Sequence, residues 1–117
     1  MDTIFWMIER LLEWKSTDRL MRLRAIDGLT PAVSETILYT RRLKDGAPRD
    51  LDKEGQLYII WGSASSMVAP LDKRLAHECL DKAEYWLMPA EYSQGKIEEL
   101  NISIVRMHAV LEQLKYQ

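Results

Sequence analysis

Apolar residues recur every three or four positions along most of the chain, which is the spacing of one face of an α-helix. The pattern begins at residues 3–14 and is longest in the segment that follows Ser93. Between these segments, capping residues, Gly and Pro mark four further helices: one that Gly28 ends, one from Pro31 to Lys44, one from Asp50 or Asp52 to Val68, and one from Leu71 to Leu87. We therefore expect residues 1–117 to form a single all-α domain, a compact bundle of five to six helices.

Residues 57–61, Leu-Tyr-Ile-Ile-Trp, are also compatible with a buried β-strand. The neighbouring Gly62 lowers helix propensity by about 1 kcal/mol. However, an isolated strand is not stable, and the chain has no second strand-like run with which it could pair. We therefore predict a helix here.

The last predicted helix has the most regular apolar stripe in the chain. The stripe consists of Ile97, Leu100, Ile104, Met107, Leu111 and Leu114. Ile102, Val105 and Val110 add apolar area on its other faces. We expect a helix of this kind to be central in the bundle, and homodimerisation through the stripe is a further prediction.

The first predicted helix carries more aromatic surface than one core-facing stripe requires. The residues concerned are Phe5, Trp6, Met7 and Trp14. Trp, Tyr, Met and Arg are enriched at protein interfaces, and large exposed aromatic patches are uncommon on monomers. We predict that these four residues contribute to a surface that binds another protein, with packing in the core as the alternative.

A turn between two helices is predicted at Gly28-Leu29-Thr30-Pro31. Gly28 can adopt the left-handed conformation that ends a helix, and Thr30 can cap the helix that follows. Pro31 suits the first position of that helix, where a missing N–H has no consequence.

Around this turn the sequence resembles the helix-hairpin-helix family of DNA-binding modules. The resemblance covers residues 19–52, and the matching residues are Ile26, Gly28, Leu29, Ser34, Ile37, Leu38, Arg41, Arg42, Gly46, Asp50 and Leu51. It implies that the backbone N–H groups of the turn bind a phosphate at a helix N-terminus. The implied nucleic-acid contacts are Gly28, Thr30, Arg24, Arg41, Arg42 and Lys44. The sequence departs from the family pattern at Thr30, which replaces the second glycine of the hairpin, and Glu35 adds negative charge nearby.

The charges of the chain are unevenly distributed. The net charge is −2, but residues 10–53 have ten Lys or Arg and seven Asp or Glu, whereas residues 54–117 have six and nine. The first region could therefore present a basic face, although a pI of about 5.7 is far from that of a dedicated nucleic-acid binder. No apolar run is long enough to span a membrane, and Asp2 precedes the first apolar run, so we expect a cytoplasmic protein.

Residues that could perform catalysis or bind metal do not form a recognisable set. His77, Asp81 and Glu84 share one helix face but have no evident fourth ligand, and His108 has no evident partner. The single cysteine, Cys79, excludes an intramolecular disulfide and is expected to be buried. Nucleotide-binding glycine motifs are also missing from the sequence. We therefore expect no enzyme activity, metal or cofactor.

The function expected from these features is that of a non-enzymatic protein–protein interaction module, such as an adaptor, regulator or inhibitor, which binds through an apolar and aromatic helical face. The alternative is a nucleic-acid-associated module that uses the turn at residues 26–38. A small helical enzyme using a histidine is a third possibility.

Overall fold

The computed structural model of the chain describes residues 3–16, 18–86 and 94–116, with side chains described for residues 6–14, 18–84, 86 and 101–116. The elements are α1 (Thr3–Leu12), the 3₁₀ helix η1 (Glu13–Ser16), α2 (Arg19–Lys44), α3 (Leu51–Val68), α4 (Lys73–Tyr85) and α5 (Gln94–Lys115). No strand occurs within the described ranges, so the predicted all-α class is confirmed. Residues 57–61 lie inside α3, as predicted.

Three aspartates determine where the inner helices begin. Asp18, Asp50 and Asp72 are the N-caps of α2, α3 and α4, and each side chain accepts a hydrogen bond from a backbone N–H three residues later, at 2.9, 3.1 and 3.1 Å. An N-cap of this kind stabilises a helix by about 0.5–2 kcal/mol. At its other end α2 stops at Asp45, where Gly46 has a φ of +96°, a left-handed conformation that favours glycine.

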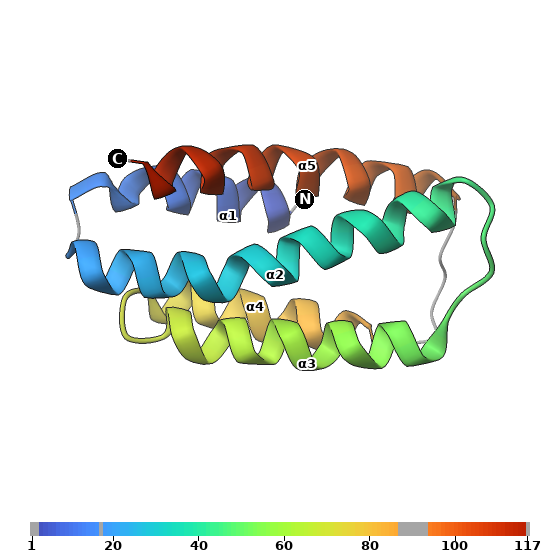
Figure 1. Cartoon of the computed structure of the whole chain (residues 1–117), viewed down its shortest axis with the longest axis horizontal. Helices are drawn as coiled ribbons and strands as arrows, with labels where there is room; N and C mark the ends of the chain where they lie inside the picture. The colour runs from blue at the N-terminus through green and yellow to red at the C-terminus, as the bar shows by residue number, and fades with distance from the viewer. Residues whose placement is uncertain (1–2, 17, 87–93, 117) are drawn as a thin grey trace.

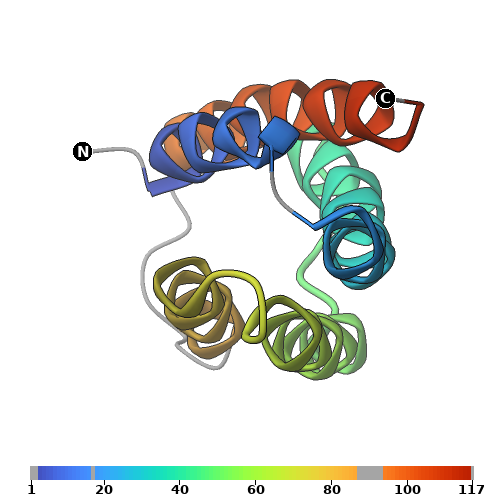
Figure 2. The same ribbon diagram turned by 90° about the vertical axis from the view of Figure 1, so that its left-hand side faces the viewer.

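The helices form two layers joined along one side by α2. Viewed end-on, α1 and α5 lie together in one layer, α3 and α4 lie together in the other, and α2 lies beside both (Figure 2). Side-on, α2 runs between α5 and α3 along the length of the molecule (Figure 1). The bundle measures 41 × 23 × 21 Å.

The core between the two layers contains apolar side chains from all five helices and from η1. Its largest fully buried side chains are Trp61, Tyr39, Met7, Leu11, Ile26, Leu29, Leu57, Leu75, Ile104, Met107 and Leu111. In the described part of the chain, no helix is both long and apolar enough to cross a membrane.

The turn predicted at residues 28–31 is wrong, because α2 continues without interruption from Arg19 to Lys44. Gly28 is buried, and a Cβ atom built on it would lie 2.8 Å from the Cβ atom of Met67 in α3. Glycine at this position therefore allows two helices to approach closely and does not end one of them. The hydroxyl of Thr30 donates to the carbonyl of Ile26, 2.7 Å away, as a threonine inside a helix can do.

Pro31 lies in the interior of α2, close to its midpoint. Proline has no N–H to donate to the carbonyl of the residue four positions earlier, which here is Asp27. Asp27 is exposed, so water can satisfy that carbonyl. A proline is also a common cause of a bend in a helix, and the two halves of α2 differ in direction in Figure 1.

A chain of buried hydrogen bonds fixes α3 and α5 against α2. Trp61 of α3 donates its indole N–H to Oγ1 of Thr36 at 3.0 Å, and Asn101 of α5 donates its amide to Oγ1 of Thr40 at 2.9 Å. Both threonine hydroxyls donate in turn to carbonyls of α2, at 2.7 and 2.8 Å. The alignment of α5 along α2 is thereby set by specific polar contacts, which supplement the apolar packing.

Candidate protein-binding groove

The surface predicted at the start of the chain is largely part of the core. Met7 and Trp14 are buried, so the prediction that they contact another protein is wrong. The physical reason is that α1 packs against both α5 and α4, which covers two of its faces. The side chain of Phe5 lies outside the described residues.

Trp6, the remaining residue of this predicted surface, is half-buried and binds α1 to α4. The guanidinium carbons of Arg10 and Arg74 lie 5.7 and 5.3 Å from the centre of its ring, a distance compatible with cation–π interaction. Arg10 also donates to the buried carboxylate of Asp72 at 2.9 Å. Burial alone would raise the pKa of Asp72, but hydrogen bonds from Arg10 and the Leu75 N–H outweigh it and hold this pKa below its usual value.

The apolar stripe of α5 is also occupied within the chain. Ile104, Met107, Leu111 and Leu114 are buried, so they cannot form the predicted dimer interface; the side chains of Ile97 and Leu100 lie outside the described residues. α5 packs with this face on α1 and α2 and exposes the opposite face to solvent. α2 packs against both α5 and α3 and so contacts both layers, whereas α5 packs against α2 and α1, so the structure does not single out α5 as the central helix.

The residues predicted to contact nucleic acid do not converge. Gly28 and Thr30 lie inside α2, so their backbone N–H groups are not at a helix N-terminus. Arg24 precedes Arg41 by 17 residues on the same helix, which separates them by about 25 Å. Arg41, Arg42 and Lys44 are exposed in the last turn of α2, where positive charge interacts favourably with the helix dipole.

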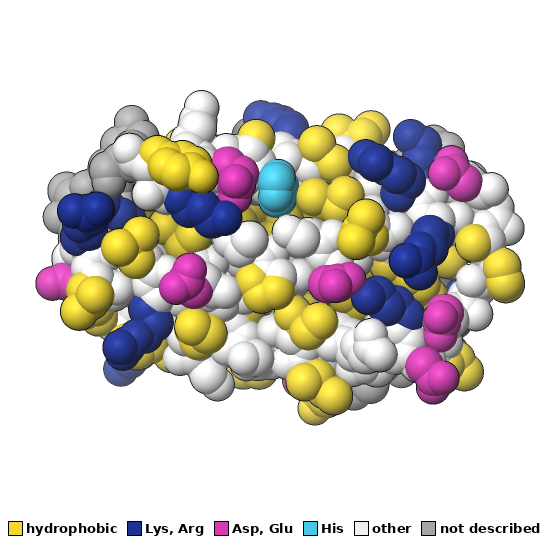
Figure 3. Space-filling model, in the orientation of Figure 1, with side chains coloured by type: hydrophobic (Ala, Val, Ile, Leu, Met, Phe, Trp, Pro, Cys, Tyr) yellow, Lys and Arg dark blue, Asp and Glu magenta, His cyan; other side chains and the backbone are white. Residues whose placement is uncertain are grey.

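An apolar groove lies on the outer surface between α2 and α5. It has a volume of about 340 Å³ and is lined by Ser34, Ile37, Leu38, Arg41, Val105 and His108. Leu38 is 48% exposed and Val105 is 42% exposed. Ile102, 61% exposed, lies one turn before Val105 on the same helix. This is the face that Figure 3 presents, where hydrophobic, basic and acidic side chains are interspersed.

Arg41 is the charged side chain among the six residues that line this groove. Residues 31–44 of α2 and 101–115 of α5 contain five Lys or Arg and two Asp or Glu, but Arg42 lines a different pocket and Lys115 pairs with Glu112. The two acidic residues form ion pairs with lysines, Glu35 with Lys53 at 2.6 Å and Glu112 with Lys115 at 2.6 Å. None of the six lining residues is acidic.

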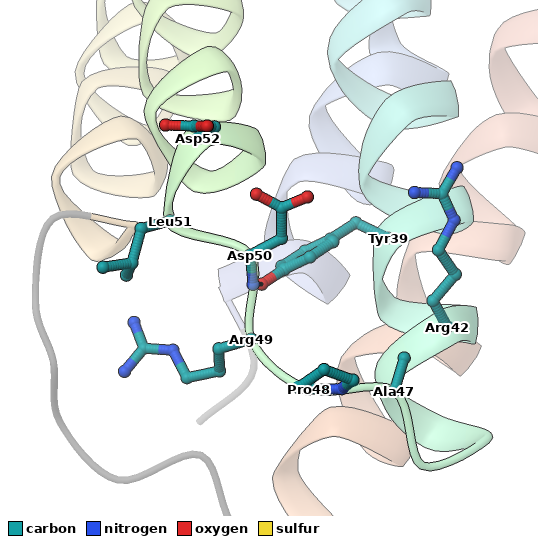
Figure 4. A pocket seen from close by; sticks show the side chains of 8 residues that line it. All are labelled: Tyr39, Arg42, Ala47, Pro48, Arg49, Asp50, Leu51 and Asp52. Carbon is teal, nitrogen blue, oxygen red and sulfur yellow. Dashed lines mark hydrogen bonds between the residues drawn. The ribbon is translucent and has the colours of Figure 1, made fainter.

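A second pocket, of about 480 Å³, lies where α2 is connected to α3 (Figure 4). Behind it, the buried carboxylate of Glu54 pairs with Arg49 and accepts a hydrogen bond from the hydroxyl of Tyr39. That hydroxyl accepts in turn from the N–H of Asp50 at 3.0 Å. Burial, together with the hydrogen bond to Glu54, raises the pKa of Tyr39 to about 12.

These contacts fasten the connection to the bundle. In Figure 4 the side chains of Arg42 and Arg49 lie on opposite sides of Tyr39, so they do not converge on one ligand. Because Arg49 is already paired with Glu54, the pocket has the features of a structural anchor and lacks a concentrated charge that would select a ligand.

The remaining titratable residues do not form a reactive centre within the described part of the chain. No group of three His, Cys, Asp or Glu side chains there is placed to hold a metal ion. Cys79 is buried, and this burial raises its pKa to about 12, which keeps the thiol in its unreactive form. His77 lines a smaller groove of about 290 Å³ between α3 and α4, together with Leu80.

Comparisons of the chain with known proteins leave its family open: no family model, curated protein or solved structure matches it. The resemblance to helix-hairpin-helix modules therefore rests on the sequence pattern alone, and the turn at its centre is a continuous helix. The groove between α2 and α5 has two exposed apolar lining residues, Leu38 and Val105, beside Arg41, whereas the groove between α3 and α4 has one, Leu80, beside Lys73.

Proposed function

We propose that the protein is a cytoplasmic, non-enzymatic interaction module that binds another protein through the groove between α2 and α5. The observation that carries the proposal is that exposed Leu38 of α2 and Val105 of α5 line one groove, with exposed Ile102 one turn before Val105. Interfaces commonly have an apolar centre with a polar rim, and here Arg41 and His108 supply the rim.

The exposed apolar area supports a contact of moderate strength. Complete burial of an aliphatic side chain contributes about 1.5–3 kcal/mol, so covering the exposed halves of three such side chains contributes on the order of 3 kcal/mol. Association itself costs at least about 4 kcal/mol in lost translational and rotational freedom. A partner must therefore also contact the polar rim, and we expect a reversible complex in which rim and centre both contribute.

The proposal is tested by affinity capture from the native host with matched variants. Leu38→Asp and Val105→Asp place a charge in the groove, whereas Ile59→Asp places one on α3, where Ile59 is 66% exposed and does not line the groove. We expect the capture to recover proteins that bind the wild type and Ile59→Asp but do not bind Leu38→Asp or Val105→Asp. Circular dichroism would establish that all variants remain folded. If the same proteins bind all four forms, the groove is not the binding surface.

A further inference from the structure

We infer that the occupant of the groove is an amphipathic helix of a partner protein whose flanks are acidic, an inference that rests on the function proposed above. Shape and charge support it separately. Both can be followed along the face shown in Figure 3.

The shape of the surface suits a helix. Ile102, Val105 and Ala109 are exposed at positions i, i+3 and i+7 of α5, so they form a straight apolar line along that helix. Leu38 of α2 lies across the groove from Val105. A helix that packs in a groove of this kind inserts apolar residues at the same spacing. An extended peptide would instead add to an open sheet edge or dock as polyproline II in an aromatic-lined groove; the described residues include no strand, and no Phe, Tyr or Trp lines this groove.

The charge of the surface favours acidic flanks. Arg41 lines the groove, and none of the six lining residues is acidic. A helix with glutamates beside its apolar stripe would place opposite charges on this rim, whereas one with lysines would place like charges there. Nucleic acid would also be attracted to the cations, but phosphates would leave Leu38, Val105 and Ile102 uncovered.

The inference can be tested with three fluorescent peptides of roughly five helical turns and the full chain. The first is an amphipathic Leu/Glu helix, the second has Lys in place of Glu, and the third contains the residues of the first in scrambled order. Fluorescence anisotropy at low and high salt would give the affinities. We expect the Leu/Glu helix to bind at least about tenfold more tightly than either of the others and to weaken as salt is added.

Variants connect this binding to the groove. Leu38→Asp should abolish binding of the Leu/Glu helix, Arg41→Glu should weaken it roughly tenfold and reduce its salt dependence, and Ile59→Asp should leave it unchanged. The inference is overturned if the lysine peptide binds as tightly, if the scrambled peptide does, or if no peptide binds. It is also overturned if a labelled DNA duplex binds more tightly than the Leu/Glu helix, or if light scattering shows a dimer that Leu38→Asp dissociates.

A failure of the peptide experiment can be distinguished from a failure of the proposed function. If affinity capture identifies a groove-dependent partner while the Leu/Glu helix does not bind, the function stands and its acidic-helix occupant is rejected. If the groove variants retain every captured protein, the proposed function itself is rejected.

Discussion

The contact between Gly28 and Met67 allows a direct measurement of how closely α2 and α3 pack. Gly28→Ala would place a Cβ atom 2.8 Å from the Cβ atom of Met67 and 3.0 Å from its sulfur, whereas carbon atoms in contact prefer about 3.5–4.0 Å. The Met67 Cβ atom is fixed to the backbone of α3 and cannot swing away. The two helices must therefore separate locally.

Two opposing effects determine the size of the change. Overpacking a core costs about 1–3 kcal/mol, whereas replacing glycine by alanine inside a helix gains up to about 1 kcal/mol. Gly28→Ala should therefore lower the free energy of unfolding by about 1 kcal/mol. Gly55 and Gly62 of α3 have no atom within 4 Å of a built Cβ, so alanine at either position should raise stability by about 0.5–1 kcal/mol. Urea unfolding followed by circular dichroism measures the free energy of unfolding of all three alanine variants.

A double-mutant cycle distinguishes a clash from backbone strain. If Gly28→Ala destabilises through the Met67 side chain, the substitution should become neutral or stabilising in a Met67→Gly background. If Gly28 instead occupied the left-handed turn suggested by the sequence, the loss would be the same in both backgrounds. An equal loss in both backgrounds would refute the packing argument and restore the turn.

Three further predictions concern single groups. Gly46→Ala should lower stability by about 1–2 kcal/mol in urea unfolding, because the φ of +96° is left-handed while no atom lies within 4 Å of the new Cβ. Because the pKa of Tyr39 is raised to about 12, the neutral phenol is stabilised in the folded state. The contribution of this neutral phenol to stability should be complete below pH ~10 and should fall, by on the order of 3 kcal/mol, as the pH rises through ~12. Tyr39→Phe should remove this alkaline loss, and urea unfolding of both proteins across that range checks it. Cys79 should not react with a disulfide reagent at neutral pH until the protein unfolds, because the thiol is buried and its pKa is raised to about 12; rapid labelling of the native protein would contradict this.

Local chemistry made the helix boundaries predictable. Asp50 was one of two candidate helix starts, with Asp52, because an N-cap acts on N–H groups only a few residues away, and Asp50 is the N-cap observed. The continuation of α2 through Gly28, where a boundary was predicted, could not be recognised in this way. Gly, Thr and Pro in close succession usually indicate a turn, but the contact that stabilises a continuous helix is with Met67, 39 residues later in the sequence. Packing between helices can override local preference, and a single sequence does not show which helices will pack.

The sequence also indicated an excess of apolar surface but not its position. Hydrophobic periodicity identifies the faces of a helix, yet α5 has apolar residues on more than one face, so periodicity alone did not decide which face is exposed. The regular stripe containing Met107 and Leu111 is buried, and the exposed face contains Ile102 and Val105, which had been counted only as additional apolar area. At the start of the chain the apolar excess had the opposite outcome, because Met7 of α1 and Trp14 of η1 are buried in the core.

The residues that suggested a DNA-binding turn therefore have a different role, which is to position the groove. Gly28 brings α2 against α3, and the hydrogen bond from Asn101 to Thr40 aligns α5 on the other side of α2. With both neighbours fixed, Leu38 and Arg41 are exposed, without a described helix over them, and line the groove beside Val105. Continuity of α2 through Thr30 and Pro31 places Gly28 and Leu38 on one helix, so a break in that helix should disturb packing and binding together. A glycine pair inserted after Pro31 is expected to weaken peptide binding as well as stability, whereas the same insertion after Gly46, beyond the groove, should spare binding.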